Sequence, residues 1–182
     1  MRVILDAAEK RLLEAGPAGL RLQEVAADVG ISHPAILHHF NSREELVAAV
    51  VTRALQALRA DLMEALAAPE PDPVKLVDRA FRTLSDRGYG RLVVWLGLSG
   101  LDPAGGQTWV REIAQMAHAR RRPNKGGKRA PFEDTLFRAM VVGLVIFGES
   151  AIGDLMRRSA GLEGDARAAA RFRVWLAGVL KV

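Results

Sequence analysis

The segment LQEVAADVGISHPAILHHF, residues Leu22–Phe40, constrains the fold of this chain more than any other feature of its sequence. It predicts two short helices joined by a turn at Gly30, because glycine readily adopts the left-handed backbone conformation of a tight turn. Ser32 is a suitable N-cap for the second helix, and Pro34 falls in its first turn, where a missing N–H costs little. The spacing favours a second helix that crosses the first at a steep angle.

The outer side of the second predicted helix carries side chains that are small or can form hydrogen bonds: Ser32, His33, Ala35 and His39. A helix that enters the major groove of DNA needs such a surface, because base edges offer only donors, acceptors and the thymine methyl group. Three of the four histidines of the chain lie in this helix. The pattern therefore predicts a DNA-reading helix. A generic three-helix bundle that does not touch DNA would show the same turn and remains an alternative.

Helical periodicity continues through the rest of the chain, whereas alternating strand patterns and Asn-Gly or Asp-Gly hairpin turns are missing. The predicted helices are a first one that Gly16-Pro17 ends, Leu22–Asp28, a short one after Ser32, one from the Ser42/Glu45 capping box to about Ala67, then 74–87, 90–99, 107–121, Phe132–Ser159 and Asp165–Lys181. We expect an all-α chain of about nine helices. Residues 1–48 would form a three-helix helix-turn-helix domain, and residues 49–182 a larger helical domain.

Composition bounds the class of protein without identifying its function. The first 50 residues hold five Lys/Arg against seven Asp/Glu, so the overall charge of +5 is weak evidence for DNA binding. Cysteine is absent, which excludes disulfides and thiolate sites. The longest apolar runs, Leu92–Leu98 and Ala139–Gly148, are shorter than the roughly 18–20 residues that span a membrane. We therefore expect a soluble, cytoplasmic protein that does not enter a membrane.

The N-terminal pattern as a whole resembles the TetR family of bacterial transcriptional regulators. The resemblance covers Ile4 to Val47 and comprises ILDAAEKRLLEAG followed by LQEVAADVGISHPAILHHFNSREEL. It departs from the family at three positions: Leu37 replaces a frequent tyrosine, Arg21 replaces a Ser/Thr cap, and Arg43 replaces a phosphate-binding lysine. The resemblance implies a ligand-responsive regulator, commonly a repressor, which binds a pseudo-palindromic DNA operator as a homodimer. The expected DNA contacts are Gln23, Ser32, His33, Pro34, Ala35, His38, His39 and Arg43.

The resemblance also implies that the last two long helices pair with those of a second subunit in a four-helix bundle. The expected interface residues are Leu136, Met140, Val141, Gly143, Leu144, Gly148, Ile152, Phe172, Trp175, Leu176 and Val179. The glycines among them would let helices approach closely. Alternatively, these residues only complete the core of one subunit.

A cavity for a small, partly apolar effector is the third implication of the resemblance. From their positions on the predicted amphipathic helices, seven residues are expected to line this cavity: Phe81, Arg91, Trp95, Met116, His118, Phe137 and Phe147. Plain core packing is the competing interpretation for each apolar one, and His118 and Arg91 would supply polar contacts. The basic segment 120–129 is interpreted as a solvated connection rather than a DNA contact.

Sequence patterns of catalysis are weak. The segment Gly148–Gly153, GESAIG, has Ile152 where a nucleophile elbow needs glycine. His38 and His39 are adjacent, so on a helix they point about 100° apart and cannot form a two-histidine metal face. We expect no enzyme activity, no cofactor and no metal site. A protein-docking adaptor that keeps the helix-turn-helix without binding DNA remains a third class.

Overall fold

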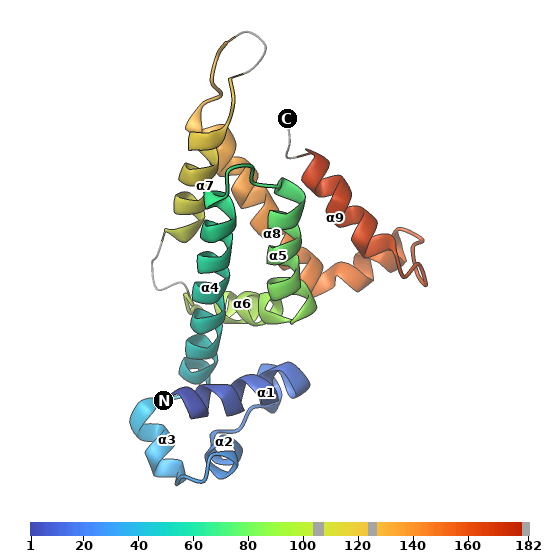
Figure 1. Ribbon diagram of the computed structural model, residues 1–182. Coiled ribbons are helices and arrows are strands. Elements are labelled where there is room, and N and C mark those ends of the chain that lie inside the picture. The colour runs from blue at the N-terminus through green and yellow to red at the C-terminus, as the bar shows by residue number, and fades with distance from the viewer. Residues whose placement is uncertain (104–107, 124–126, 180–182) are drawn as a thin grey trace.

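A computed structural model describes residues 1–103, 108–123 and 127–179, and no strand occurs among them. The helices are α1 (Arg2–Gly19), α2 (Leu22–Asp28), α3 (His33–His39), α4 (Arg43–Ala67), α5 (Pro73–Phe81), the π-helical turn η1 (Arg82–Asp86), α6 (Tyr89–Leu98), α7 (Trp109–Arg120), α8 (Phe132–Ser159) and α9 (Ala168–Val179). The expected all-α fold of nine α-helices is confirmed for these residues (Figure 1).

Helix α1 differs from its expected form at the Gly16-Pro17 pair. Gly16 leaves the helical conformation, with φ of 69° and ψ of 178°, so the helix breaks where the sequence predicts. One further turn then continues to Gly19 before the chain becomes extended at Leu20. Proline suits the first turn of such a second segment because its missing N–H needs no partner there.

Helix α4 is continuous and connects the two halves of the molecule (Figure 1). Ser42 caps it, since its hydroxyl accepts a hydrogen bond from the Glu45 backbone N–H at 3.1 Å. The Glu45 carboxylate reaches back to the Asn41 backbone N–H at 3.0 Å, one residue earlier than an ideal capping box. Apolar side chains recur along the buried face of α4 at helical spacing: Leu46, Val47, Val50, Val51, Leu55, Leu58, Leu62 and Leu66. Nearly all of them pack in one core that extends from α1 to α9.

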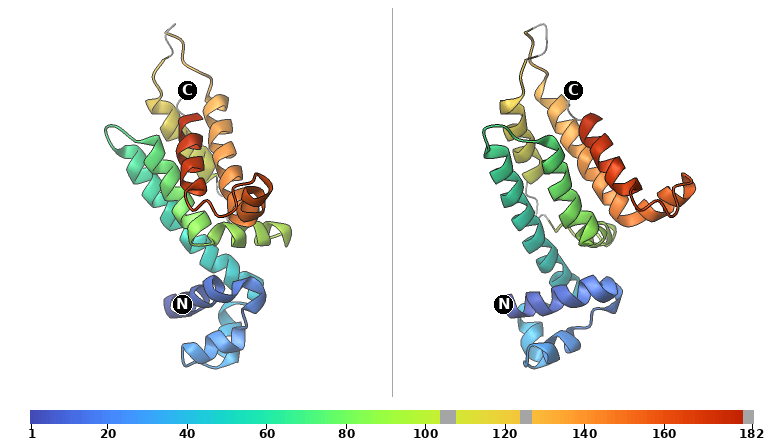
Figure 2. Two further views of the ribbon diagram at one scale, coloured as in Figure 1. Left: turned by 90° about the vertical axis from the view of Figure 1, so that its right-hand side faces the viewer. Right: turned by 45° about the vertical axis from the view of Figure 1, so that its right-hand side comes forward.

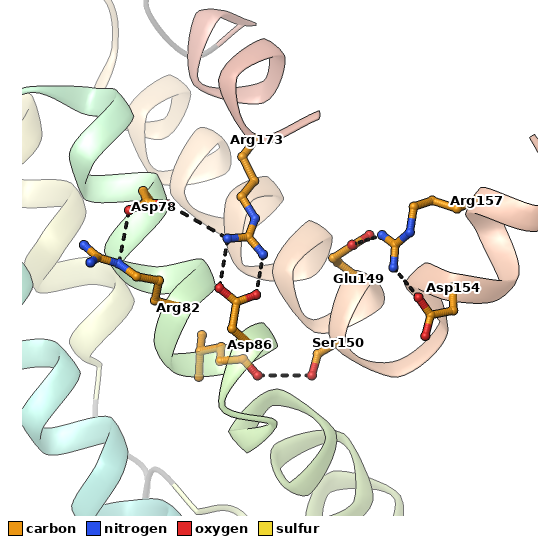
Figure 3. Close-up of polar contacts among 9 residues, drawn as sticks. Asp78, Arg82, Asp86, Glu149, Ser150, Asp154, Arg157 and Arg173 are labelled. Carbon is orange, nitrogen blue, oxygen red and sulfur yellow. Dashed lines mark hydrogen bonds and ion pairs between the residues drawn. The ribbon is translucent and has the colours of Figure 1, made fainter. Parts of the chain in front are cut away.

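In the C-terminal half, α5, α6 and α7 pack against α4, and α6 lies across the lower end of this half (Figures 1 and 2). Helix α8 packs against α6, α7 and η1, and α9 packs against α5. The close approach of α6 to α8 occurs at Gly90, where a Cβ atom would lie 2.8 Å from the Leu84 carbonyl oxygen and from Ser150. The Ser150 hydroxyl donates to that same carbonyl at 3.1 Å, which fixes α8 to η1 (Figure 3).

A half-buried arginine, Arg173, attaches α9 to the rest of the molecule (Figure 3). The Arg173 guanidinium bonds to the Asp86 carboxylate at 2.9 Å, lies 3.9 Å from Asp78, and covers the Phe81 ring at 4.8 Å from its centroid. The hydrogen bond with Asp86 raises the pKa of Arg173, so the guanidinium stays charged. Asp86 itself is exposed, so the position of α9 on α5 depends on these polar contacts together with the packing of the Arg173 guanidinium on the buried Phe81 ring.

Candidate nucleic-acid interface and ligand cavity

The turn between α2 and α3 depends on the left-handed conformation of Gly30, whose φ is +71°. Backbone hydrogen bonds close the turn: Gly30 N–H donates to the Ala27 carbonyl at 3.2 Å, and Ile31 N–H donates to the Ala26 carbonyl at 3.0 Å. This is the pattern of a helix C-terminus that ends in a left-handed glycine. The predicted turn at Gly30 is therefore confirmed.

Helix α3 begins at a polar cap and is held by its inner side. The Ser32 hydroxyl accepts a hydrogen bond from the Ala35 backbone N–H at 3.3 Å, as the sequence predicts. Ile36 is fully buried and Phe40 almost so, and both belong to the core shared with α1 and α4. Truncating a buried side chain of this size to alanine typically costs about 2–5 kcal/mol, so these two contacts define the orientation of α3.

The outer side of α3 faces solvent at the end of the molecule remote from α5, α8 and α9 (Figure 1). Of the residues expected to contact DNA, Ser32, Pro34, His38 and His39 are exposed. Gln23 is also exposed, whereas His33, Ala35 and Arg43 are half-buried. The rings of His38 and His39 meet edge to face, with 5.5 Å between their centroids. Seven of these eight residues lie on α2 or at α3, so they form one surface, which we call the reading surface.

Arg43 turns partly away from the reading surface. Its guanidinium bonds to the Glu44 carboxylate at 2.8 Å and lies 5.7 Å from the centroid of the Trp95 ring on α6. A backbone hydrogen bond at Glu44 and the Arg43 guanidinium hold the pKa of Glu44 below its usual range. A DNA phosphate would have to compete with Glu44 for this cation. Trp95 was expected in the ligand cavity, but it lies instead at the junction of α6 and α4.

Ion pairs between Arg11 of α1 and two carboxylates of α2 hold these helices together. The Arg11 guanidinium bonds to Asp28 at 2.8 Å and also pairs with Glu24. The hydrogen bond from Arg11 holds the pKa of Asp28 below its usual range. Because both carboxylates belong to α2, this pairing offsets part of the negative charge of the N-terminal region near the reading surface.

The C-terminal half contains a cavity of about 930 Å³ between α4, α5, α7 and α8. Its body is apolar and includes Leu58 and Leu62 of α4, Leu76 and Val77 of α5, Ile113 of α7 and Phe147 of α8. Ligand pockets for small molecules typically measure about 300–1,000 Å³ and are predominantly apolar. The cavity therefore has the size and the character of a site for a small organic ligand.

Only Phe147 of the seven residues expected at a ligand site lines this cavity; Phe81, Arg91, Trp95, Met116, His118 and Phe137 lie outside its lining. Phe81 is fully buried beneath Arg173, whereas Phe137 is 55% exposed on the outer face of α8. His118 bonds to the Thr135 hydroxyl at 3.0 Å, and only Thr135 reaches the cavity. Amphipathic position identifies a buried face, but it does not tell which neighbouring helices leave space beside it. The lining residues of α4 were missed for that reason.

The residues expected at a dimer interface form, for the most part, an open apolar face on α8 and α9. Met140, Val141, Leu144, Ile152, Phe172 and Trp175 are exposed, Leu136, Gly143 and Gly148 are half-buried, and the rings of Phe172 and Trp175 stack at 6.0 Å. A Cβ atom added at Gly143 or Gly148 would meet nothing within 4 Å, so packing within the chain does not require glycine at either position.

Leu176 and Val179 differ from the other residues expected at the interface. Leu176 is only 4% exposed, so the structure places it in the core of the single chain rather than on the open face. Val179 is the last described residue of α9, and its side chain lies outside the described part of the chain. Leu136, Met140, Gly143 and Leu144 also line the cavity, which places the cavity directly beneath the open face of α8.

Helix α8 is long and apolar enough to cross a membrane by length and composition, with a mean hydropathy of 1.7 over its most apolar 18 residues. Uninterrupted apolar runs alone do not reveal this property, because charged residues divide the helix. In the fold, however, one side of α8 packs on α6 and α7, and its polar residues are engaged: Ser150 with the Leu84 carbonyl and Glu149 with Arg157. These contacts favour a packed helix with one open face.

Comparison with known proteins agrees with this geometry. Residues 4–50 match the model described as bacterial regulatory proteins of the tetR family. A Streptomyces coelicolor protein assigned as a transcriptional regulator is similar over 99% of this chain and 95% of its own, with 18% identity and a TM-score of 0.60. The TetR-family transcriptional regulator PfmR from Thermus thermophilus is similar over 98% and 97%, with 21% identity and a TM-score of 0.58.

A TetR variant from Acinetobacter baumannii, solved in complex with minocycline, is similar over 97% of this chain and 92% of its own, with 15% identity and a TM-score of 0.54. No curated protein sequence matches the chain. The family match in the N-terminal domain and the shared fold confirm the resemblance that the sequence indicates.

Proposed function

We propose that this chain, whose residues 4–50 match the tetR family and whose fold is similar to that of TetR-family regulators, is a homodimeric repressor that an effector releases from its DNA operator. Residues 1–48 would bind DNA, and residues 49–182 would bind effector and a second subunit. The observation that carries the proposal is that two separate sites lie at opposite ends of the continuous helix α4. The exposed helix α3 lies at the N-terminal end of α4, and the cavity lies beside its C-terminal half. Binding to chromosomal DNA would place the protein in the bacterial cytoplasm.

The reading surface supports DNA binding through its chemistry. It presents imidazole, hydroxyl and amide groups, which match the donors and acceptors of base edges in the major groove. One such surface offers few contacts, whereas two copies about 34–36 Å apart would reach successive major grooves of a pseudo-palindrome. The open face of α8 and α9 supplies an apolar surface through which two copies would associate.

The cavity supports release by a small molecule. A ligand that binds one conformer of the C-terminal half more tightly than another shifts the population of the whole molecule, and DNA affinity changes by the same coupling. The structurally similar TetR variant is solved with minocycline, so this fold accommodates a small organic ligand in that protein. An effector here would occupy the space between α4, α5, α7 and α8.

Operator selection from a random duplex library, followed by fluorescence anisotropy, tests DNA binding. We expect the affinity for the selected duplex to fall steeply between about 50 and 200 mM salt, because phosphate contacts release counterions. The double substitution His38→Ala/His39→Ala should weaken binding at least about tenfold, since a good base contact contributes roughly 1–3 kcal/mol. His118→Ala, which changes the histidine on α7, serves as the matched control and should bind as the wild type does.

A protein-docking adaptor, whose helix-turn-helix does not bind DNA, would give a different result in the operator selection. If no duplex is enriched and no salt-dependent binding is measured, the helix-turn-helix does not read DNA in this protein and the proposal is wrong. Equal losses from the α3 and α7 substitutions would also contradict the assignment of the reading surface.

A further inference from the structure

The charged residues that line the cavity all have the same sign. Five arginines contribute to the lining, Arg111, Arg120, Arg121, Arg122 and Arg138, and no aspartate or glutamate does so among the described lining residues. The other lining residues are apolar apart from Thr108 and Thr135. Arg111, Arg120 and Arg122 are exposed and Arg121 and Arg138 are half-buried, so the charges lie at the border between the apolar space and solvent. A ligand with an apolar body and an anionic group would complement both parts of this lining.

The guanidinium groups gather where α7 ends and α8 begins. Arg120, Arg121 and Arg122 are at the C-terminus of α7, and Arg138 is in the second turn of α8. The Arg111 guanidinium reaches the same region, since it lies 5.3 Å from the centroid of the Phe132 ring in the first turn of α8. We call these five residues the arginine cluster.

Part of the positive charge of the arginine cluster has no acidic partner among the described residues. Arg121 and Arg138 share one carboxylate, Asp134, whose pKa they hold below its usual range. Arg120 donates to the Ala67 and Ala68 carbonyls at the end of α4. Arg111 and Arg122 have no acidic partner in the part of the chain that the structure describes.

A second hollow gives an internal comparison. It measures about 780 Å³ and lies between α1, α4, α5, η1 and α6. Its lining holds arginines together with Asp6, Glu9 and Asp61, and ion pairs join Arg53 to Asp6 and Arg79 to Asp61. Charge of both signs is therefore paired there, whereas the arginine cluster concentrates charge of one sign at one end of an apolar space.

Resting on the function proposed above, we infer that the effector of this protein is an anionic amphiphile. Its apolar chain or ring system occupies the body of the cavity between α4, α5 and α8, and its carboxylate or phosphate group binds the arginine cluster. Guanidinium groups suit both anions because their planar N–H donors form paired, charge-assisted hydrogen bonds with them. Arg111 and Arg122 carry the unpaired charge and would make the decisive contacts.

Isothermal titration of the full-length protein with four probes of equal chain length tests the inference. The probes are dodecanoate, dodecyl phosphate, dodecan-1-ol and dodecylammonium, with the ions below their micelle concentrations and the alcohol below its solubility limit. We expect both anions to bind at least about tenfold more tightly than the alcohol, and the ammonium ion most weakly. The better of the two anions identifies the head group. Equal affinities for the anions and the alcohol, or preference for the cation, would overturn the inference.

Variants locate the contact. Arg111→Gln/Arg122→Gln should lose about tenfold in affinity for the anions and keep the affinity for the alcohol. Arg158→Gln, an exposed arginine at the opposite end of α8, is the matched control and should change neither. If the preference for anions persisted in the Arg111→Gln/Arg122→Gln variant, the inferred contact with the arginine cluster would be wrong.

The two proposals fail in different ways. A neutral apolar ligand that releases the operator would overturn the anionic effector and leave the regulatory function intact. Absence of operator binding in the anisotropy experiment would overturn the function, whatever the titrations show.

Discussion

Gly30 is the residue on which the crossing of α2 and α3 depends. Its φ of +71° is a conformation that an L side chain rarely adopts, yet a Cβ atom there would meet nothing within 4 Å. Gly30→Ala should therefore lower the free energy of unfolding through backbone strain alone, by about 1–2 kcal/mol. Chemical denaturation followed by circular dichroism measures this change.

Asparagine provides the control at the same position, because it tolerates left-handed backbone better than alanine does. Gly30→Asn should be the less damaging substitution although its side chain is larger. If alanine were tolerated better than asparagine, crowding rather than φ would govern the site.

Asp28 should make the stability of the N-terminal domain depend on pH. Its folded-state pKa lies below the ordinary value because Arg11 donates to it, so the ionised form is stabilised by folding. This stabilisation is complete above the ordinary carboxyl pKa of about 4 and disappears as the pH falls through the lower folded-state pKa. Asp28→Asn should lower the Tm at pH 7, and the difference from wild type should shrink steadily as the pH falls from about 5 to about 2.

The difference in Tm between Asp28→Asn and the wild type removes the contribution of the other carboxylates, because these titrate in both proteins. Glu163→Gln changes an exposed glutamate in the turn before α9 and should show almost no difference from wild type at any of these pH values. A gap between Asp28→Asn and wild type that stays constant down to the acid end of this range would argue against the Arg11 contact.

At the scale of helices, the approach of α6 to α8 is limited by Gly90. A methyl group there would lie 2.8 Å from both the Leu84 carbonyl oxygen and Ser150, so α6 must move away or η1 must distort. Gly90→Ala should lower the free energy of unfolding by about 1–3 kcal/mol, the usual cost of overpacking. Gly97→Ala, on the same helix with nothing within 4 Å of the added methyl group, should be neutral or stabilising. Equal effects of both substitutions would show that helix propensity, not the contact with α8, determines the outcome.

The helices themselves were largely predictable because their ends are encoded locally. Ser32 and Ser42 act as caps in the structure as they do in the sequence pattern, and Gly30 forms the expected turn. The π-helical turn at 82–86 was not predictable, since its hydrogen-bond pattern follows from the packing of Leu84 and Ser150 between three elements.

The cavity was the least predictable feature. Phe81 and Phe147 occupy similar positions on apolar helix faces, but only Phe147 borders a space. Which apolar side chain lines a cavity depends on where four helices fail to fill the volume between them, and no single helix carries that information. The arginine cluster was likewise divided in sequence between α7, the following segment and α8, and only the fold brings it together.

For the molecule as a whole, the open face of α8 is the feature that a single chain leaves unexplained. Ile152 is exposed on this face and does not line the cavity, so Ile152→Glu tests association without altering the ligand site. The substitution should convert a dimer to a monomer in sedimentation velocity experiments, because a charge buried in an apolar interface is strongly unfavourable. Leu98→Glu, at a leucine that is 85% exposed on α6, should remain dimeric. A wild-type protein that sediments as a monomer at all concentrations would contradict the proposed assembly.

In the proposed function, coupling between the cavity and the reading surface would pass through the junction of α1, α4 and α6. There the Tyr89 hydroxyl of α6 donates to the Glu9 carboxylate of α1, while Arg53 of α4 bonds to Asp6 at 2.6 Å and pairs with Glu9. Burial, followed by the contact with Glu9, raises the pKa of Tyr89, so its hydroxyl remains protonated and donating throughout the physiological range. This hydrogen bond is a direct link between α6 and the N-terminal domain.

Tyr89→Phe removes the link and keeps the ring. Because one such hydrogen bond contributes roughly 1 kcal/mol, the factor by which effector weakens operator binding should fall about fivefold, whereas effector affinity without DNA should change little. Ser99→Ala removes a hydrogen bond confined to α6, from the Ser99 hydroxyl to the Trp95 carbonyl at 2.9 Å, and should preserve the coupling. The ratio of operator Kd values with and without saturating effector measures it. If Tyr89→Phe lowered only the Tm and left this ratio unchanged, the hydroxyl would stabilise the junction without transmitting the signal, and coupling would have to pass through the apolar contacts of α6 with α4.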